Sequence, residues 1–223
     1  RVERHGGSGE VAELVLRTNV AQNVLLTTER ARGVEFTETF IRLMHWLEEH
    51  ADLNRELEFL PSTRELNRRI EEGRGLVSPE FAVLLAYAKL HLKDALLDSD
   101  LPDDEWFTST LLEYLPPAMR ERFPEQIMAH PLRREIIVNS VVNSMVNRGG
   151  ITFAFRALEE TGAQPDHVAR AFVVAREVFD LRGFVEQVEA LDNQVPTSWL
   201  GYLLIKHLAP GIVQGNALSG SRY

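Results

Sequence analysis

The chain has 223 residues, of which 44% are hydrophobic and 26% are charged, and it contains no cysteine. A chain of this length and composition can bury a globular core unaided, and the lack of cysteine excludes disulfides, thiolate nucleophiles and thiolate metal sites. With 24 basic and 33 acidic residues its formal net charge is −9, so we expect no nucleic acid and no anionic membrane as a partner.

Helical spacing of apolar residues begins close to the N-terminus. Residues 9–32 and residues 36–51 both carry apolar side chains at intervals near three and four, which predicts an amphipathic helix in each segment. Ser62 is followed three residues later by Glu65, and this capping-box pattern predicts a short charged helix that ends near Gly73.

The most apolar helix is predicted from Ser78 to Leu97. Pro79 suits its first turn, where the N–H that proline lacks would have no partner. A wide apolar stripe predicts a place at the centre of a helical bundle. The stripe comprises Phe81, Leu84, Leu85, Ala88, Leu92, Ala95 and Leu96, extended by Val83 and Leu90. Because four polar side chains interrupt this helix, we expect no membrane span. They are Lys89, His91, Lys93 and Asp94.

Prolines and glycines punctuate the second half of the chain, where proline favours helix starts and glycine favours helix ends. These signals predict helices over residues 102–115, 116–129, 131–148, 165–180 and 181–192, with C-caps at Gly149 and Gly162. The sequence contains no convincing run of alternating β-branched residues bounded by turn signals, so no strand is predicted. The expected fold is therefore an all-α bundle or array of nine to ten helices, with no Rossmann unit.

We expect one helical domain over residues 1–197. The proline-rich corner at residues 115–118 is the best internal boundary, but the sequence does not predict two independent domains there. The residue pattern of 198–223 differs from that of the preceding segments, and we expect an atypical tail there: a divergent last helix, an expression scar or residues joined across a gap. Since the chain starts at Arg1 without an initiator methionine or a signal-like apolar run, we also expect a fragment or processed piece.

Residues 7–12, Gly-Ser-Gly-Glu-Val-Ala, match the letters of a dinucleotide-binding pattern. That pattern binds pyrophosphate where a buried strand leads into the turn and a helix follows it. Here a short charged segment precedes the glycines and no strand–helix–strand unit follows. We therefore interpret the match as chance and predict no cofactor-binding residue in this chain.

Titratable side chains are scattered along the sequence. We expect His91 to be a core or rim residue with one hydrogen bond, and His130 to cap a helix junction. The pairs Asp103–Asp104 and Glu159–Glu160 fall at helix starts or exposed faces, where negative charge is stabilised or solvated. One cluster offers metal ligands, but a solvated helix end explains it better. It comprises Glu48, Glu49, His50 and Asp52, with His45 nearby. We predict no catalytic and no metal-binding residue.

The helix predicted over residues 131–148 carries an asparagine ladder, Asn139, Asn143 and Asn147, at four-residue spacing. Residues four apart share one helix face, and asparagine is a mediocre helix former, so three in register indicate a role. One hypothesis is an interface with a catalytic domain or another subunit. The other, which we prefer, is an internal polar network, because buried polar groups need partners. The candidates for either are Arg133, Arg134, Asn139, Asn143, Asn147 and Arg148.

Four blocks of sequence carry a resemblance to a known family. They are EVAELVLRTN (residues 10–19), ELEFLPS (56–62), LVSPEFAVLLAYAKLHLKDALLDSDLPDD (76–104) and HPLRREIIVNSVVNSMVNRGGITFAFRALEETGA (130–163). Together they resemble the carboxy-terminal helical region of the large-subunit class of bacterial NAD-specific glutamate dehydrogenases. The likeness runs from about residue 9 to about residue 197, in long ordered blocks that are far more specific than any short motif here.

The resemblance implies that the parent chain converts glutamate, NAD and water to 2-oxoglutarate, ammonia and NADH. In this family the nucleotide-binding fold and the catalytic lysine lie upstream of this region. We therefore expect NAD to bind the parent chain and not this part, which alone should be inactive. Expected partners are the catalytic domain of the same chain and other subunits of a homo-oligomer, in the cytoplasm. The alternative is an independent helical protein-interaction or scaffold module, which a natural start codon close to Arg1 would favour.

Overall fold

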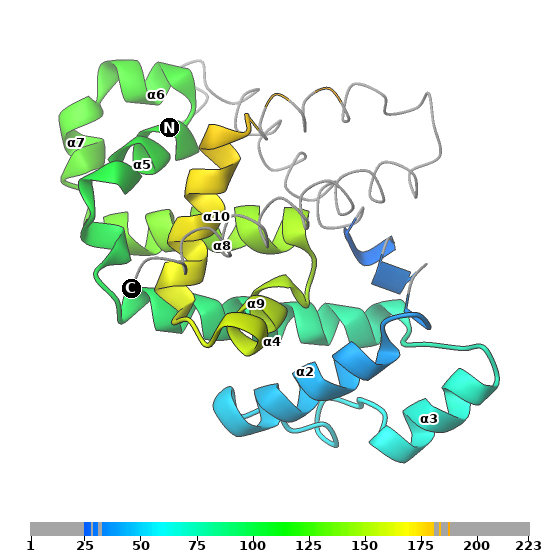
Figure 1. Ribbon diagram of the computed structural model, residues 1–223. Helices are drawn as coiled ribbons and strands as arrows, with labels where there is room; N and C mark the ends of the chain where they lie inside the picture. Colours follow the sequence, from blue (N-terminus) through cyan, green and yellow to red (C-terminus); the bar gives the residue numbers. More distant parts are fainter. Residues whose placement is uncertain (1–24, 28, 31–32, 181–182, 184–186, 188–223) are drawn as a thin grey trace.

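The computed structural model describes residues 25–27, 29–30, 33–180, 183 and 187. Within these residues every regular element is a helix, which confirms the all-α prediction (Figure 1). The α-helices that lie wholly within the described residues are α2 (Thr37–His50), α3 (Thr63–Glu71), α4 (Ser78–Leu97), α5 (Thr108–Tyr114), α6 (Pro117–Arg122), α7 (Pro124–Met128), α8 (Arg133–Gly149), α9 (Phe153–Thr161) and α10 (Pro165–Val178). Most of the helices predicted over 9–32 and 181–192, and all of the tail over 198–223, lie outside the described residues.

Helices α4 and α8 pack against each other at the centre of the described structure. In Figure 1 they run side by side, with α10 crossing them, α2 and α3 below and α5 to α7 at the opposite end. The α8 side chains of Val142 and Met145 are fully buried. Phe40 of α2 meets Phe81 of α4 edge-on, with ring centroids 5.0 Å apart. Burial of this apolar surface is the main stabilising contribution to such a fold.

The buried face of α4 differs from the predicted stripe at two neighbouring residues. Most of the stripe is buried, but Leu90 is 56% exposed and Lys89 only 8% exposed. At 100° per residue, Lys89 falls on the arc shared by Leu85 and Leu96, whereas Leu90 falls on the opposite side. The extension of the stripe to Leu90 was therefore wrong. No helix in the described part of the chain is long and apolar enough to cross a membrane.

The segment from residue 102 to residue 129 is more broken than predicted. Instead of one helix over 102–115, two 3-10 helices, η2 (Leu101–Asp103) and η3 (Glu105–Phe107), precede the short α5. Asp104 between them is extended, and its carboxylate accepts a hydrogen bond from the Trp106 backbone N–H at 3.0 Å.

The helix predicted over residues 116–129 is divided into α6 and α7 at Phe123, which has φ −134°. The residue before a proline is disfavoured in the helical region, and Pro124 follows here. Two short helices therefore replace the single predicted one.

Two glycines end helices in different ways. Gly162 follows α9 in the left-handed conformation, with φ +65°, as its predicted role as a C-cap requires. Gly149, predicted as the other C-cap, is instead the last residue of α8. The neighbouring Gly150, with φ +97°, turns the chain. The prediction was thus displaced by one residue at the glycine pair.

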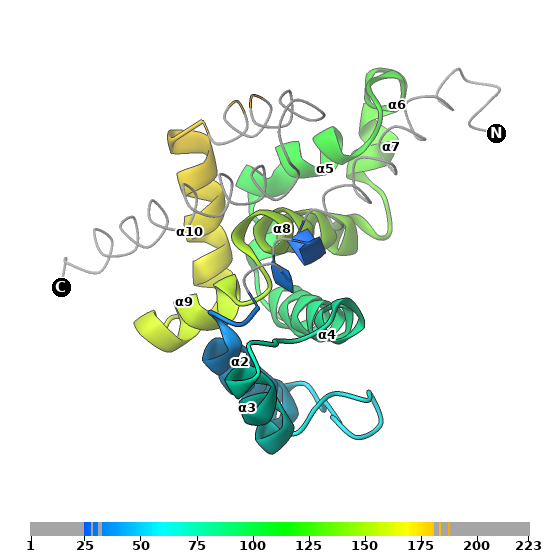
Figure 2. The same ribbon diagram turned by 90° about the vertical axis from the view of Figure 1, so that its right-hand side faces the viewer.

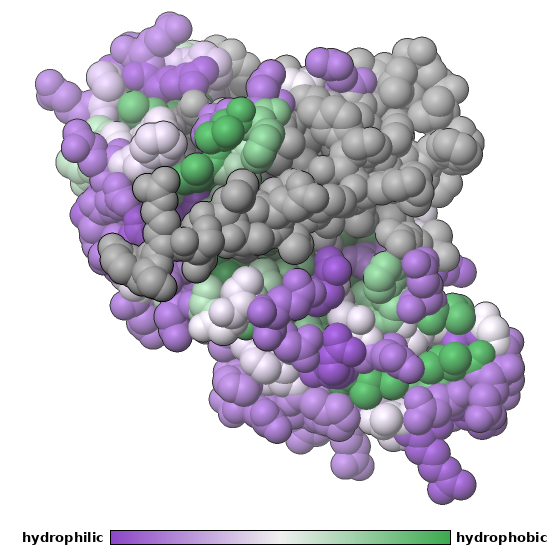
Figure 3. Space-filling model, viewed as in Figure 1, coloured by the Kyte–Doolittle hydropathy of each residue, from purple (hydrophilic) through white to green (hydrophobic). Residues whose placement is uncertain are grey.

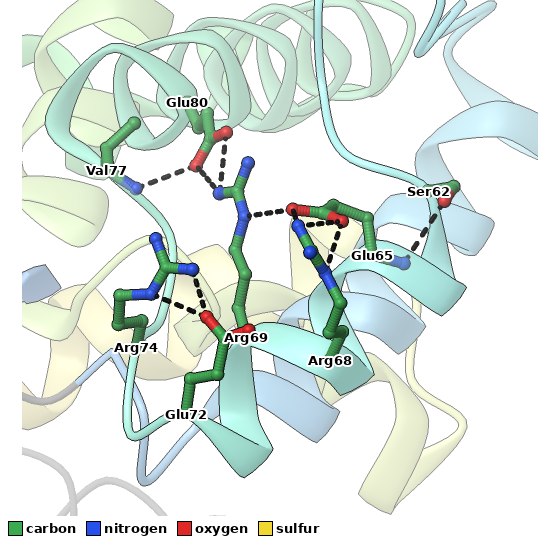
Figure 4. Close-up of polar contacts among 8 residues, drawn as sticks. All are labelled: Ser62, Glu65, Arg68, Arg69, Glu72, Arg74, Val77 and Glu80. Atoms are coloured by element: carbon green, nitrogen blue, oxygen red, sulfur yellow. Dashed lines mark hydrogen bonds and ion pairs between the residues drawn. The ribbon is translucent and has the colours of Figure 1, made fainter.

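The N-terminus of α3 is capped as predicted. The Ser62 hydroxyl accepts a hydrogen bond from the Glu65 backbone N–H at 3.2 Å (Figure 4). We expect Ser62→Ala to lower the free energy of unfolding by about 1 kcal/mol, because one N–H of the first turn loses its acceptor. Urea denaturation of the variant and of Ser62→Thr, which keeps the hydroxyl, measures this. Equal losses in both variants would contradict the capping role.

Helix α3 is joined to the start of α4 by a partly buried ion pair. Arg69 Nη1 donates to both carboxylate oxygens of Glu80 at 3.0 and 3.1 Å, while its Nε donates to Glu65 (Figure 4). Glu80 also accepts from the Val77 backbone N–H at 2.7 Å, so one carboxylate caps α4 and holds α3. The charge of Glu80, which is 8% exposed, is thereby satisfied by several donors.

On the face drawn in Figure 3, the described residues are mostly hydrophilic, with local apolar patches. On that face, hydrophobic residues gather at the upper end of α10 (Figure 3). There Val178 is 70% exposed and Phe179 is 60% exposed. Isolated exposed apolar residues are normal on a protein surface, so only a patch with further structural support indicates binding.

Candidate functional site

The candidate site lies between the two central helices, where a lysine of α4 meets the asparagine ladder of α8. Lys89 Nζ donates to Asn143 Oδ1 at 2.9 Å and to Asn147 Oδ1 at 2.8 Å. Asn143 and Asn147 stand one helical turn apart on the same face, which brings both amide oxygens toward one point. The arrangement is a single ammonium group held by two neutral acceptors from the facing helix.

The surroundings of Lys89 oppose its positive charge. Burial lowers the pKa of Lys89 from its ordinary value of 10.5 to about 8, and the nearby charge of Lys93 adds to the effect. The two amide oxygens satisfy N–H donors but carry no full negative charge, so they offset only part of the desolvation. At neutral pH the ammonium form therefore predominates, although it is less stable than in water.

This burial has a consequence for stability at alkaline pH. The unfolded chain keeps the ordinary pKa of 10.5, so between pH 8 and 10.5 it binds a proton that the folded protein does not. Stability contributed by this group should therefore rise with pH through that window, by about 2 kcal/mol after allowance for the water that reaches the site.

The pH effect is measured by urea denaturation at pH 8 and pH 10 for the wild type and for Lys89→Met. We expect the variant to lack the wild-type increment, because it has no proton to lose at residue 89. Lys93→Met should keep most of the increment, because it removes only the smaller of the two causes that lower the pKa of Lys89. The same pH increment in Lys89→Met and the wild type would contradict the assignment.

The third asparagine, Asn139, lies one turn closer to the start of α8. Its side chain is partly exposed and makes no hydrogen bond to the residues that the structure describes. The ladder is therefore divided: two amides hold Lys89, and the third is not engaged within the described part of the chain.

The two arginines at the start of α8 contact the end of α4 and the segment that follows it. Arg134 Nη2 donates to the backbone carbonyls of Leu97 at 2.7 Å and Ser99 at 3.2 Å. Arg133 Nη2 donates to Asp103 at 2.8 Å, and Arg134 also pairs with Asp103. A guanidinium beside the last carbonyls of a helix satisfies acceptors that have no partner in the helix itself. Arg134 thus fastens α8 to the end of α4, and both arginines fasten it to Asp103 of η2.

At the other end of α8, Arg148 Nη1 donates to Ser144 Oγ at 2.8 Å. The same hydroxyl accepts from Arg176 Nη1 of α10 at 3.3 Å, and Arg176 also pairs with Glu177. Ser144 is 7% exposed, so two guanidinium groups converge on one buried hydroxyl. This contact ties α8 to α10.

Five of the six predicted site residues therefore make side-chain hydrogen bonds within the same chain, and Asn139 makes none to the described residues. The internal contacts support the network hypothesis, while an additional interface role for the same helix stays a prediction. Chemically, the arrangement supplies donors and acceptors that hold α8 against α4, α10 and η2. The ammonium of Lys89 has both of its acceptors on α8, where that helix packs against α4.

The ring nitrogens of His91 and His130 have their partners outside this site. His91 Nδ1 lies 3.2 Å from the His50 carbonyl oxygen, its ring meets Trp46 edge-on, and burial lowers its pKa. His130 Nδ1 accepts from the Leu132 backbone N–H at 3.1 Å, as expected of a capping residue. In the part of the chain that the structure describes, no three His, Asp or Glu side chains gather as metal ligands.

Three members of the site, Lys89, Ser144 and Arg176, were not predicted from the sequence. In the sequence Lys89 is one of the charges that interrupt the apolar helix. A signal was nevertheless present, because residues 85, 89, 92 and 96 follow the period of one helix face. For Ser144 and Arg176 there was no comparable signal, since their meeting depends on how α10 crosses α8. The glycine pattern at residues 7–12 lies outside the described residues.

Comparison with known proteins gives consistent matches. A family model described as "Glutamate dehydrogenase, C-terminal" matches residues 73–207. Proteins named NAD-specific glutamate dehydrogenase from Mycobacterium tuberculosis and Pseudomonas aeruginosa are 40% and 41% identical over 189 and 186 residues, which are 85% and 83% of this chain. One from Halomonas elongata is 39% identical over 84% of the chain. The chain spans 12% of the length of each of these relatives.

Proposed function

This chain belongs to the glutamate dehydrogenase C-terminal family, and from that premise we propose that it is the non-catalytic helical portion of an NAD-dependent glutamate dehydrogenase. The parent chain would convert glutamate, NAD and water to 2-oxoglutarate, ammonia and NADH, with NAD held outside this region. The helices described above would brace the catalytic domain or the contacts between subunits.

The observation that carries this proposal is the fastening of α4 to α8. Burial lowers the pKa of Lys89 to about 8, and both of its acceptors, Asn143 and Asn147, belong to the adjoining helix. A lysine that acts as a base or nucleophile must reach its substrate. Lys89 is 8% exposed and donates within the core, which supports a structural role.

The electrostatics of the remaining candidates support the same role. Arg133 and Arg134 are engaged by Asp103 and by carbonyls at the end of α4, and Arg148 by Ser144. A dehydrogenase must orient a nicotinamide ring against its substrate and accept the proton released from the amine. The described site instead uses its charges to hold helices together, which suits a rigid support for chemistry performed elsewhere in the parent.

The proposal is tested by glutamate-dependent NAD reduction, followed at the NADH absorbance band. The intact parent protein is compared with the same protein cut just before Arg1. We expect the truncated protein to remain soluble and to lose either turnover by at least about tenfold or its subunit assembly, read by light scattering. A truncated protein with unchanged turnover, assembly and melting temperature would rule out bracing.

Two further measurements separate the parts of the proposal. Titration of this chain with NADH by calorimetry should give no saturable heat, and micromolar binding would overturn the non-catalytic assignment. An intact parent that reduces no NAD with glutamate would overturn the parent reaction. That outcome would favour an independent helical interaction or scaffold module.

A further inference from the structure

We propose that the α2–α3 loop, residues 54–60, is an apolar plug that docks into a basic-rimmed apolar pocket of the preceding catalytic part of the same polypeptide. The proposal rests on the proposed function, since it takes the rest of the dehydrogenase chain as the partner.

The loop exposes two large apolar side chains. Leu57 is 73% exposed and Phe59 is 89% exposed, whereas the flanking Leu53 and Leu60 are 4% and 7% exposed. The flanking residues anchor the loop in the core, and the two between them point into solvent. An aromatic and an aliphatic side chain this exposed, two positions apart in one loop, form a small apolar patch available for contact with a partner.

The loop is held in one conformation by its own hydrogen bonds. Asn54 Oδ1 accepts from the backbone N–H groups of Glu56 and Leu57, both at 3.1 Å. The Tyr87 hydroxyl of α4 donates to Glu58 Oε1 at 2.8 Å and fastens the loop from outside. A preorganised loop loses little entropy when it binds, so its exposed side chains contribute more of their burial energy to affinity.

The backbone at Phe59 is also unfavourable. Its φ is +55°, in the left-handed region that bulky L-residues rarely adopt. Glycine would relieve this strain, but it would remove the exposed ring. Strain of this kind persists where the surrounding structure enforces it, and it clusters at binding surfaces. The loop therefore keeps a strained conformation that presents an aromatic ring to solvent.

The position and charge of the loop point to its partner. Figure 2 shows the loop projecting from the α2–α3 end of the molecule, away from α8 and α10. The match covers 12% of each relative, so most of such a polypeptide lies outside this region and is available to receive the loop. Of the exposed carboxylates, Glu49 and Asp52 precede the loop in the chain and Glu56 lies within it, which favours a basic rim on the receptor.

A second copy of the loop is a poorer receptor. A two-fold interface would place each copy's acidic residues against those of the other copy, since such an interface joins identical patches. Like charges that meet across an interface weaken it. The electrostatics thus favour a different segment of the polypeptide over a symmetrical contact between loops.

The test is photo-crosslinking in the intact parent protein. The photoreactive residue p-benzoylphenylalanine is placed at Phe59 in one variant and at Leu57 in another. A matched control carries it at Leu90, an exposed apolar residue on the outer side of α4. Unlabelled and ¹⁵N-labelled protein are mixed and reassembled before irradiation, and mass spectrometry then identifies the crosslinked peptides and the isotope composition of each pair.

We expect the Phe59 or Leu57 probe to crosslink, at least about tenfold more than the Leu90 probe, to a peptide outside this chain with the same isotope label. Mixed-label pairs would show that another subunit covers the loop and would overturn the proposed partner. Labelling no greater than at Leu90, from both loop probes, would overturn docking altogether. The readout does not use turnover, so an inactive parent with same-label crosslinks would reject the proposed function and leave the docking surface standing.

Discussion

Replacing both Asn143 and Asn147 with leucine is expected to lower the free energy of unfolding by about 3 kcal/mol. Leucine has nearly the shape of asparagine but no acceptor, so the ammonium of Lys89 would remain between α4 and α8 without the two oxygens at 2.9 and 2.8 Å. For a chain of this size the melting temperature should fall by roughly 6–12 °C. Urea denaturation followed by circular dichroism measures the change.

Two further variants show whether the loss comes from the stranded charge. Adding Lys89→Met to the double variant should restore most of the stability, because an apolar residue needs no acceptor. Asn139→Leu alone should change stability by less than about 0.5 kcal/mol, since that amide holds nothing in the described part of the chain. If the double variant has the melting temperature of the wild type, the ladder is not an internal network, and the interface hypothesis would replace it.

Gly149→Ala is expected to destabilise the protein by about 2–3 kcal/mol, even though alanine is the better helix former. A methyl group at this position would stand 2.6 Å from Cγ of Phe153, closer than real atoms of this kind approach. Phe153 is 3% exposed and packs edge-on against Phe172 of α10, so its ring has little room to move. Thermal unfolding should shift down by roughly 4–12 °C.

Gly162→Ala is the matched control for this steric effect. Gly162 has φ +65° but no atom within 4 Å of an added methyl, so only the backbone conformation opposes the substitution. We expect a loss of about 1 kcal/mol there. A Gly149→Ala variant as stable as the wild type would mean that Phe153 can move, and that the close contact of α8 with the start of α9 is not required.

Helix signals with local causes were predictable. Ser62 accepts from Glu65, the pair Ser78 and Pro79 begins α4, and Gly162 ends α9, because each depends on backbone groups within a few residues. The predictions failed where two local signals competed. Phe123 left the helical conformation before Pro124 because the restriction on the residue preceding a proline acts there.

Only the part of the candidate site that α8 contributes could be predicted from the sequence. The four-residue spacing of Asn139, Asn143 and Asn147 is enough to place all three on one helix face. Their partner, Lys89, lies 54 residues before Asn143, and the sequence shows only that it shares a period with buried leucines. A lysine in such a position is usually at the surface, so burial could not be inferred from its type.

By itself the sequence determined the helical class, the caps of several helices, the apolar face of α4 and the asparagine face of α8, because each depends on the spacing of residues close together in the chain. It also determined the family, through long blocks of similar sequence. The tertiary structure alone decided which groups meet. It brought Lys89 under two of the three asparagines, set Arg148 and Arg176 on one serine hydroxyl, and left Phe59 exposed. These outcomes depend on the packing of helices far apart in the chain, and no local period encodes the angle at which one helix crosses another.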